Sequence, residues 1–163
     1  MDELFAPPGD AWQPVSPKLV VQRRLFLALQ GVVLLAVLAV GLWVVDLGMV
    51  FSAVVLAAAL AAFAWGMVAV GRNARSWGYA ETDEDLHIKS GVMFRRMVTV
   101  PYGRMQYVDV HAGPLDQYFG IANVHLHTAS PGTSASIPGL PADEAARLRD
   151  RLTSLGEAQA AGL

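Results

Sequence analysis

The sequence contains two apolar runs, LFLALQGVVLLAVLAVGLWVV (residues 25–45) and MVFSAVVLAAALAAFAWGMVAV (residues 49–70), joined by Asp46, Leu47 and Gly48. Neither run contains Lys, Arg, Asp or Glu. A helix of about 20 apolar residues, rising 1.5 Å per residue, spans the roughly 30 Å hydrocarbon core of a bilayer. We therefore expect a tight transmembrane hairpin with both flanks on one side of the membrane.

The flanking charges predict which side that is. The basic residues are Lys18, Arg23 and Arg24 before the first run, and Arg72 and Arg75 after the second. The link between the runs carries only Asp46. Because cytoplasmic flanks are enriched in Lys and Arg, both termini are expected in the cytoplasm. A cleaved signal peptide is the main alternative for the first run, but its apolar core is shorter than this run.

The second run is rich in small residues, and Ala58, Ala62 and Gly66 recur at four-residue spacing. Small residues at this spacing let helix backbones approach closely in lipid. They indicate either packing against the first run or a surface for self-association. With no ionisable side chain inside either run, the hairpin is interpreted as an anchor rather than a transport pathway.

The pattern changes after Ser76 to short alternating segments punctuated by Gly, Pro and Asp, which is typical of strands and turns. The candidate strands are 77–82, 86–90, 95–100, 104–111, 121–128 and 134–137. An amphipathic helix follows, with Pro141 in its first turn and Gly156 as its expected end. The predicted fold is α+β: a transmembrane helical hairpin, then an antiparallel β-barrel or sandwich capped by a C-terminal helix.

Several short motifs in this region resemble one known family. They are VPYGRMQYVDV (100–110), GPL (113–115), FGIA (119–122), LHTA (126–129) and IPGL (137–140). In this order they are similar to bacterial pleckstrin-homology-like (PH-like) membrane proteins of the YdbS-like kind, over roughly residues 18 to 155. The resemblance implies two nearly orthogonal antiparallel sheets closed by the last helix. It also implies an interaction module, often paired with a larger membrane protein carrying several such domains.

These inferences divide the chain into segments. They are an N-terminal cytoplasmic segment (1–24), the hairpin (25–70), the PH-like domain (76–155) and a flexible tail (156–163). The expected location is the bacterial plasma membrane.

Lipid headgroup contacts are expected from basic residues near the membrane, namely Arg72, Arg75, Arg95 and Arg96. For Arg95 and Arg96, a solvated hairpin edge that discourages strand pairing is the favoured interpretation. The first expected hairpin of the domain reads Glu81-Thr82-Asp83-Glu84-Asp85. Its four carboxylates would repel an anionic headgroup, which argues against specific phosphoinositide recognition.

Three histidines, His111, His125 and His127, are candidate metal ligands, because His125 and His127 share one face of an expected strand. Exposed strand positions are the favoured interpretation, so neither a metal nor any other cofactor is predicted. The chain lacks cysteine, a nucleophile elbow and a phosphate-binding glycine loop, and we expect no enzymatic activity. Its net charge of −2 gives no basis for nucleic-acid binding.

The segment between His111 and Ile121 presents Leu115, Tyr118 and Phe119, which plug the core, contact the membrane-proximal edge or contact a partner protein. The preferred function is a membrane-anchored, non-enzymatic interaction or scaffold module on the cytoplasmic face. It would assemble with itself or with a related PH-like membrane protein. The alternative is a lipid-sensing or lipid-binding membrane protein.

Overall fold

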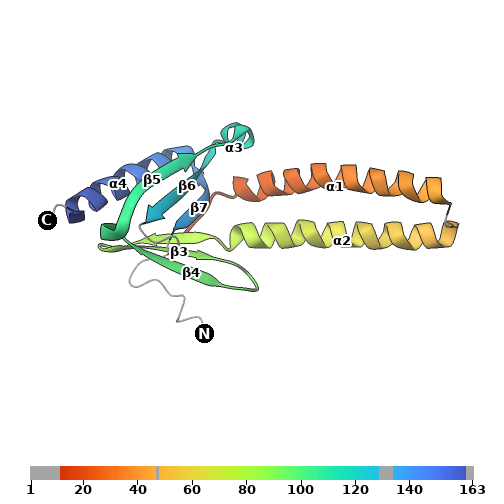
Figure 1. Cartoon of the computed structure of the whole chain (residues 1–163), viewed down its shortest axis with the longest axis horizontal. Helices are drawn as coiled ribbons and strands as arrows, with labels where there is room; N and C mark the ends of the chain where they lie inside the picture. The colour runs from red at the N-terminus through yellow and green to blue at the C-terminus, as the bar shows by residue number, and fades with distance from the viewer. Residues whose placement is uncertain (1–11, 47, 129–133, 161–163) are drawn as a thin grey trace.

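The computed structural model describes residues 12–46, 48–128 and 134–160. Two long helices, α1 (Lys18–Val45) and α2 (Met49–Arg75), run side by side and project from one end of the β-domain (Figure 1). Both are long and apolar enough to cross a membrane. The helices contact closely where Gly31 of α1 leaves room for the ring of Phe63 of α2. The helices continue beyond the apolar runs at the domain end, to Lys18 and Arg75.

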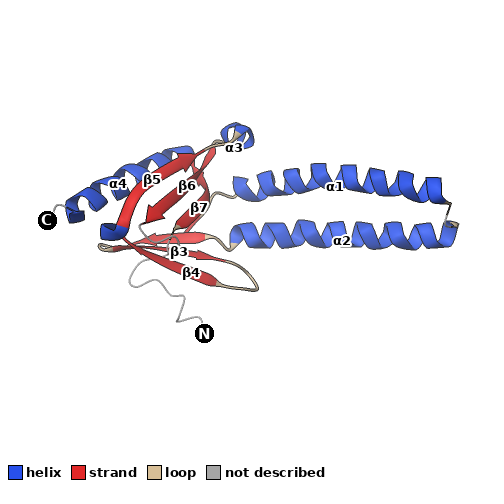
Figure 2. Cartoon of the chain, in the orientation of Figure 1, coloured by secondary structure: helices blue, strands red, loops and turns tan. Residues whose placement is uncertain are grey.

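The β-domain consists of two antiparallel sheets and a C-terminal helix (Figure 2). The first sheet has the order β1-β2-β3-β4 and the second the order β5-β6-β7. The strands are β1 (Gln13–Pro14), β2 (Gly78–Glu81), β3 (Asp85–Ser90), β4 (Arg96–Pro101), β5 (Met105–His111), β6 (Ile121–Thr128) and β7 (Ala135–Pro141). The predicted fold class is confirmed, and the six strands expected from alternation correspond to β2–β7.

The C-terminal helix α4 (Ala142–Ala160) packs Leu148 and Leu152 into the core. The helix does not end at Gly156 as expected but continues to Ala160. The prediction of a flexible tail is therefore wrong for residues 156–160. Good helix formers follow this glycine, and Leu155 still packs against the core, so the helix continues.

A short 3₁₀ helix, η2 (Tyr102–Arg104), explains part of the VPY motif. Tyr102 is completely buried, and its hydroxyl donates a hydrogen bond to the Thr82 carbonyl over 2.9 Å. Burial, which disfavours the charged phenolate, raises the pKa of Tyr102 to about 12. The motif therefore supplies an aromatic core residue whose polar end is satisfied.

The hairpin is inserted within the domain rather than placed before it, which corrects the predicted boundary at residue 76. β1 precedes α1 and pairs with β2, with Gln13 opposite Tyr79. Val15, Leu19 and Val20 on the way into the hairpin, and Ala74 on the way out, all belong to the core of the β-domain. β1 has only two residues and therefore shows no alternating pattern. For this reason it was not recognised within the predicted N-terminal segment 1–24.

Gly139 of β7 contacts the residues that lead into the hairpin, Ser16 and Leu19. Its carbonyl accepts a hydrogen bond from the Ser16 amide over 2.9 Å. A Cβ at Gly139 would lie 2.7 Å from the Leu19 Cβ, and the backbone has φ = +66°, so only glycine suits this position. Leu19 itself is 3% exposed. The first turn of α1 thus packs against the IPGL motif.

Shortening Leu19 tests this shared core. We expect Leu19→Ala to lower the free energy of unfolding by about 2–5 kcal/mol, because it leaves a cavity under β7. Denaturant unfolding of the detergent-solubilised full chain, followed by near-ultraviolet circular dichroism, measures the change. Val21→Ala, on the exposed side of the same helix, is the control. Equal stability of the two variants would contradict a core shared with the hairpin.

Candidate functional site

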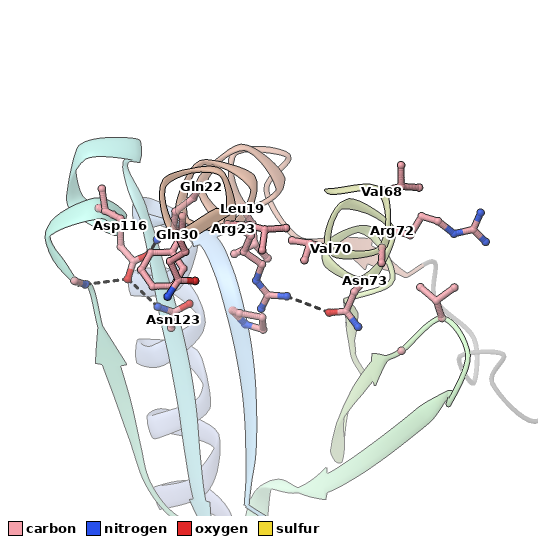
Figure 3. A pocket seen from close by; sticks show the side chains of 18 of the residues that line it. Leu19, Gln22, Arg23, Gln30, Val68, Val70, Arg72, Asn73, Asp116 and Asn123 are labelled. Atoms are coloured by element: carbon pink, nitrogen blue, oxygen red, sulfur yellow. Dashed lines mark hydrogen bonds between the residues drawn. The ribbon is translucent and has the colours of Figure 1, made fainter. Parts of the chain in front are cut away.

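A groove of about 1320 Å³ lies where the hairpin meets the β-domain (Figure 3). Its walls come from α1, α2, the β3–β4 loop and the short helix α3 (Pro114–Phe119). Phe26, Trp65 and Val68, which belong to the apolar runs, line its apolar part. Its polar part is lined by Gln22, Arg23, Asn73, Asp116 and Asn123. The groove therefore spans the level at which the membrane-embedded surface gives way to the domain.

Asp116 is the centre of the polar part. It is 9% exposed, and its Oδ2 accepts hydrogen bonds from the Gly113 amide (2.9 Å) and the Asn123 side chain (3.0 Å). The Gln22 side chain of α1 donates to the other oxygen, Oδ1. The Asn123 oxygen accepts in turn from the Gly139 amide over 3.0 Å. Asp116 thus joins α1, α3 and the second sheet by hydrogen bonds to a charged acceptor.

The GPL and FGIA motifs account for the position of this carboxylate. Pro114 begins α3, where a missing N–H has no cost, and Gly120 ends it with φ = +64°. Asp116 lies in the first turn, where a negative charge is favourable. The sequence places this segment between two expected strands and predicts no helix in it. It forms a helix, and its polar centre, Asp116, was missed because this residue lies between the two motifs.

The three side chains predicted to form an interaction surface in this segment differ in exposure. Tyr118 is 82% exposed and Leu115 is 40% exposed. Phe119 packs against the core cluster instead, with its ring in edge-to-face contact with that of Tyr118 at 5.3 Å between centroids. Tyr118 and Leu115 are thus available for a contact, whereas Phe119 mainly supports them.

A second polar contact joins the two helices at the groove. Arg23 of α1 and Asn73 of α2 point toward one another, with 3.2 Å between Nη1 and Oδ1, whereas Arg72 points away from them (Figure 3). The neighbouring Arg24 donates from Nε to the Met67 carbonyl over 3.2 Å. The basic flank of α1 therefore also fastens the hairpin at its base, which its charge pattern alone did not indicate.

The small-residue positions in α2 are not on one contact surface. Gly66 faces α1, because a Cβ there would lie 3.6 Å from a Leu27 methyl carbon. Ala58 and Ala62 are exposed. Packing against the first run therefore accounts for Gly66 but for neither alanine.

The basic residues suggested for headgroup contact lie at the hairpin end of the domain. Arg72 lines the groove, Arg75 ends α2, and Arg95 and Arg96 follow the β3–β4 turn. Burial, and next the positive charge of Arg95, lower the pKa of nearby Lys89. Positive charge is thus concentrated at this end.

The acidic β2–β3 turn lies at the opposite end of the sheet, away from the hairpin (Figure 1). Glu81 there forms ion pairs with Arg147 (2.6 Å) and Arg151 (3.1 Å) of α4. The hydrogen bond from Arg147 also lowers the pKa of Glu144. The carboxylates expected to oppose a headgroup therefore lie at the end of the domain that is farthest from the hairpin.

The candidate metal ligands are not assembled into a site. His111 and His125 lie edge to face, with 5.5 Å between ring centroids, and His111 pairs with Asp109 at 2.8 Å. His127 stacks on Tyr107 at 4.3 Å instead. Within residues 12–46, 48–128 and 134–160, no group of three such ligands gathers.

Comparison with known proteins gives two findings. Residues 24–155 match the sequence pattern of the family described as Bacterial PH domain. A stretch of 79 residues is 39% identical to the UPF0699 transmembrane protein YdbS of Bacillus subtilis (strain 168) and covers 48% of each chain. The aligned part thus spans about half of this relative's length. No solved structure matches the chain. The family resemblance expected from the motifs is confirmed.

Proposed function

Because the chain is a membrane protein that belongs to the bacterial PH domain family, we propose that it is a membrane-anchored, non-enzymatic interaction module. It assembles with itself or with a related membrane protein at the cytoplasmic face of the plasma membrane. The observation that carries this proposal is the shared core of hairpin and domain. A domain held in one orientation relative to the membrane presents the same surfaces to every neighbouring protein in that membrane.

The charge distribution supports the cytoplasmic orientation. The basic flanks of both helices lie at the domain end of the hairpin, and Asp46 lies at the other end. Positive flanks are retained in the cytoplasm, so the domain and both termini are assigned to that side.

Cysteine labelling tests this orientation, because the natural chain contains no cysteine. Met49, at the link, is 90% exposed, and Asp83 lies in the exposed β2–β3 turn. With a membrane-impermeant maleimide, we expect Met49→Cys to react in cells whose outer layers are opened but whose plasma membrane is intact. Asp83→Cys should react only after lysis. The reverse pattern would place the domain outside.

Two exposed features support assembly. Ala58 and Ala62 are small, exposed side chains on α2, where another transmembrane helix could pack closely. Tyr118 on α3 supplies an exposed aromatic side chain of the kind enriched at protein interfaces.

Enlarging the α2 surface tests this assembly. Native mass spectrometry and crosslinking of gently extracted protein should show discrete oligomers, or a second PH-domain membrane protein that copurifies. We expect Ala58→Leu combined with Ala62→Leu to reduce this association, because the larger side chains keep helix backbones apart. Ala36→Leu combined with Ala39→Leu, at exposed positions of α1, is the matched control. A monomer without partners in native membranes would contradict the proposal.

A second function, lipid binding, is favoured by the groove itself. Its apolar wall begins within the membrane-embedded runs, and Arg23 lies in its polar part. This arrangement suits a phospholipid, whose chains would contact Phe26 and Trp65 and whose phosphate would accept hydrogen bonds from Arg23.

Removing the Arg23 charge tests lipid binding. We expect Arg23→Gln to weaken binding of anionic phospholipid about tenfold or more, because a charge-assisted hydrogen bond is lost while an amide donor remains for Asn73. Lipid adducts of the purified full chain in native mass spectra measure the change. Arg75→Gln, outside the groove but at the same membrane face, is the control. Equal lipid retention by both variants would exclude this site.

A further inference from the structure

The turn between β3 and β4 carries three consecutive apolar residues, Val92, Met93 and Phe94, which we name the β3–β4 tip. Met93 and Phe94 are each 85% exposed, and Val92 is 38% exposed. A single exposed apolar residue is ordinary, but adjacent large ones at the end of a hairpin usually mark an interaction surface. The exposed apolar tip is therefore expected to contact another surface.

The tip is fixed beside the domain end of α2. The Gly91 amide donates a hydrogen bond to the Ser76 hydroxyl over 3.0 Å, and that hydroxyl donates to the Asn73 carbonyl over 2.7 Å. Gly91 has φ = +94°, and a Cβ on it would overlap the Phe94 carbonyl, so the tight turn requires glycine. These contacts hold the turn against the last residues of the second helix.

The depth of the tip follows from its neighbours. Val92, Met93 and Phe94 line the same groove as Trp65 and Val68, which lie inside the second apolar run. Val68 is two residues and Trp65 five residues from the end of that run at Val70, which places them about 3–8 Å inside it. The tip therefore lies beside the domain end of that run, next to the boundary layer in which interfacial segments bury their apolar side chains about 5–10 Å deep.

Charge around the tip agrees with an anionic lipid surface. Arg95 and Arg96 follow it directly, and Lys89 precedes it on β3. The carboxylates of the β2–β3 turn lie at the far end of the same strands (Figure 1). An apolar tip with a basic collar suits the cytoplasmic leaflet, where anionic headgroups surround accessible acyl chains.

We propose that the β3–β4 tip inserts into the headgroup and acyl boundary of the cytoplasmic leaflet and forms a second membrane contact beside the hairpin. Val92, Met93 and Phe94 enter the boundary, and Arg95 and Arg96 contact lipid phosphates above it. This contact does not depend on a lipid bound in the groove or on assembly with a partner. It would fix the rotation of the domain about the hairpin axis.

Spin labelling of single-cysteine variants tests the insertion, because the full chain supplies a cysteine-free background. The variants are Met93→Cys and Phe94→Cys at the tip. Asp83→Cys serves as the water-exposed reference and Val37→Cys, in mid-span, as the bilayer reference. Each labelled full chain is reconstituted in vesicles of equal parts phosphatidylcholine and phosphatidylglycerol. Collision rates with oxygen, which concentrates in the bilayer, and with a water-soluble nickel chelate are then compared.

We expect the tip labels to lose most of the nickel collisions seen at Asp83→Cys while keeping high oxygen collisions, which gives a depth between the two references. Arg95→Gln with Arg96→Gln should move the labels toward water. Nickel collisions equal to those of Asp83→Cys would overturn the proposal. Loss of both collision types would also overturn it, because a protein surface would then cover the tip. The substituted side chains are exposed, and near-ultraviolet circular dichroism confirms that each variant is folded.

Discussion

The hydrophobic core that the hairpin shares with the β-domain is the constraint on which the rest of the structure depends. The chain leaves the domain through Leu19 and Val20 and returns through Ala74, and all three are buried in that core. Tilting the domain against the hairpin would expose these side chains, at about 25 cal/mol per Å² of apolar surface. The Asp116 hydrogen bonds to Gln22 and Asn123 oppose the same movement. Anchor and domain therefore act as one rigid unit.

Because the orientation of the domain relative to the hairpin is fixed, each surface of the domain has a definite distance from the membrane. Arginines and exposed apolar side chains are concentrated at the hairpin end, whereas Glu81 and its arginine partners on α4 lie at the far end. With a Debye length of about 8 Å at physiological salt, charges at the far end have little effect on headgroups. A charge sum over the whole chain, −2, therefore says little about the surface that faces the lipid.

Much of the fold could be predicted from local pattern. The hairpin follows from two long runs without charge, and β5 and β6 follow from alternation such as Val108 and Val110 against Asp109 and His111. What could not be predicted depends on contacts between distant residues. Gln13 pairs with Tyr79 across the whole hairpin, and Leu19 packs on Gly139. The groove was missed for this reason, since its lining comes from six segments that are separate in the sequence. The apolar tip at Val92–Phe94 was visible in the sequence, but its depth was not.

The polar groups of the groove are engaged in hydrogen bonds within the protein. Asp116 is the carboxylate among its described lining residues, and both oxygens already accept hydrogen bonds, from Gly113, Asn123 and Gln22. A general base needs an oxygen directed at a substrate proton, whereas this carboxylate is occupied in holding three segments together. Arg23, similarly, is engaged by Asn73 through one of its several donors and retains others for an acceptor in the groove. The polar groups therefore position the walls of the groove, and what remains for a ligand is apolar surface bordered by positive charge.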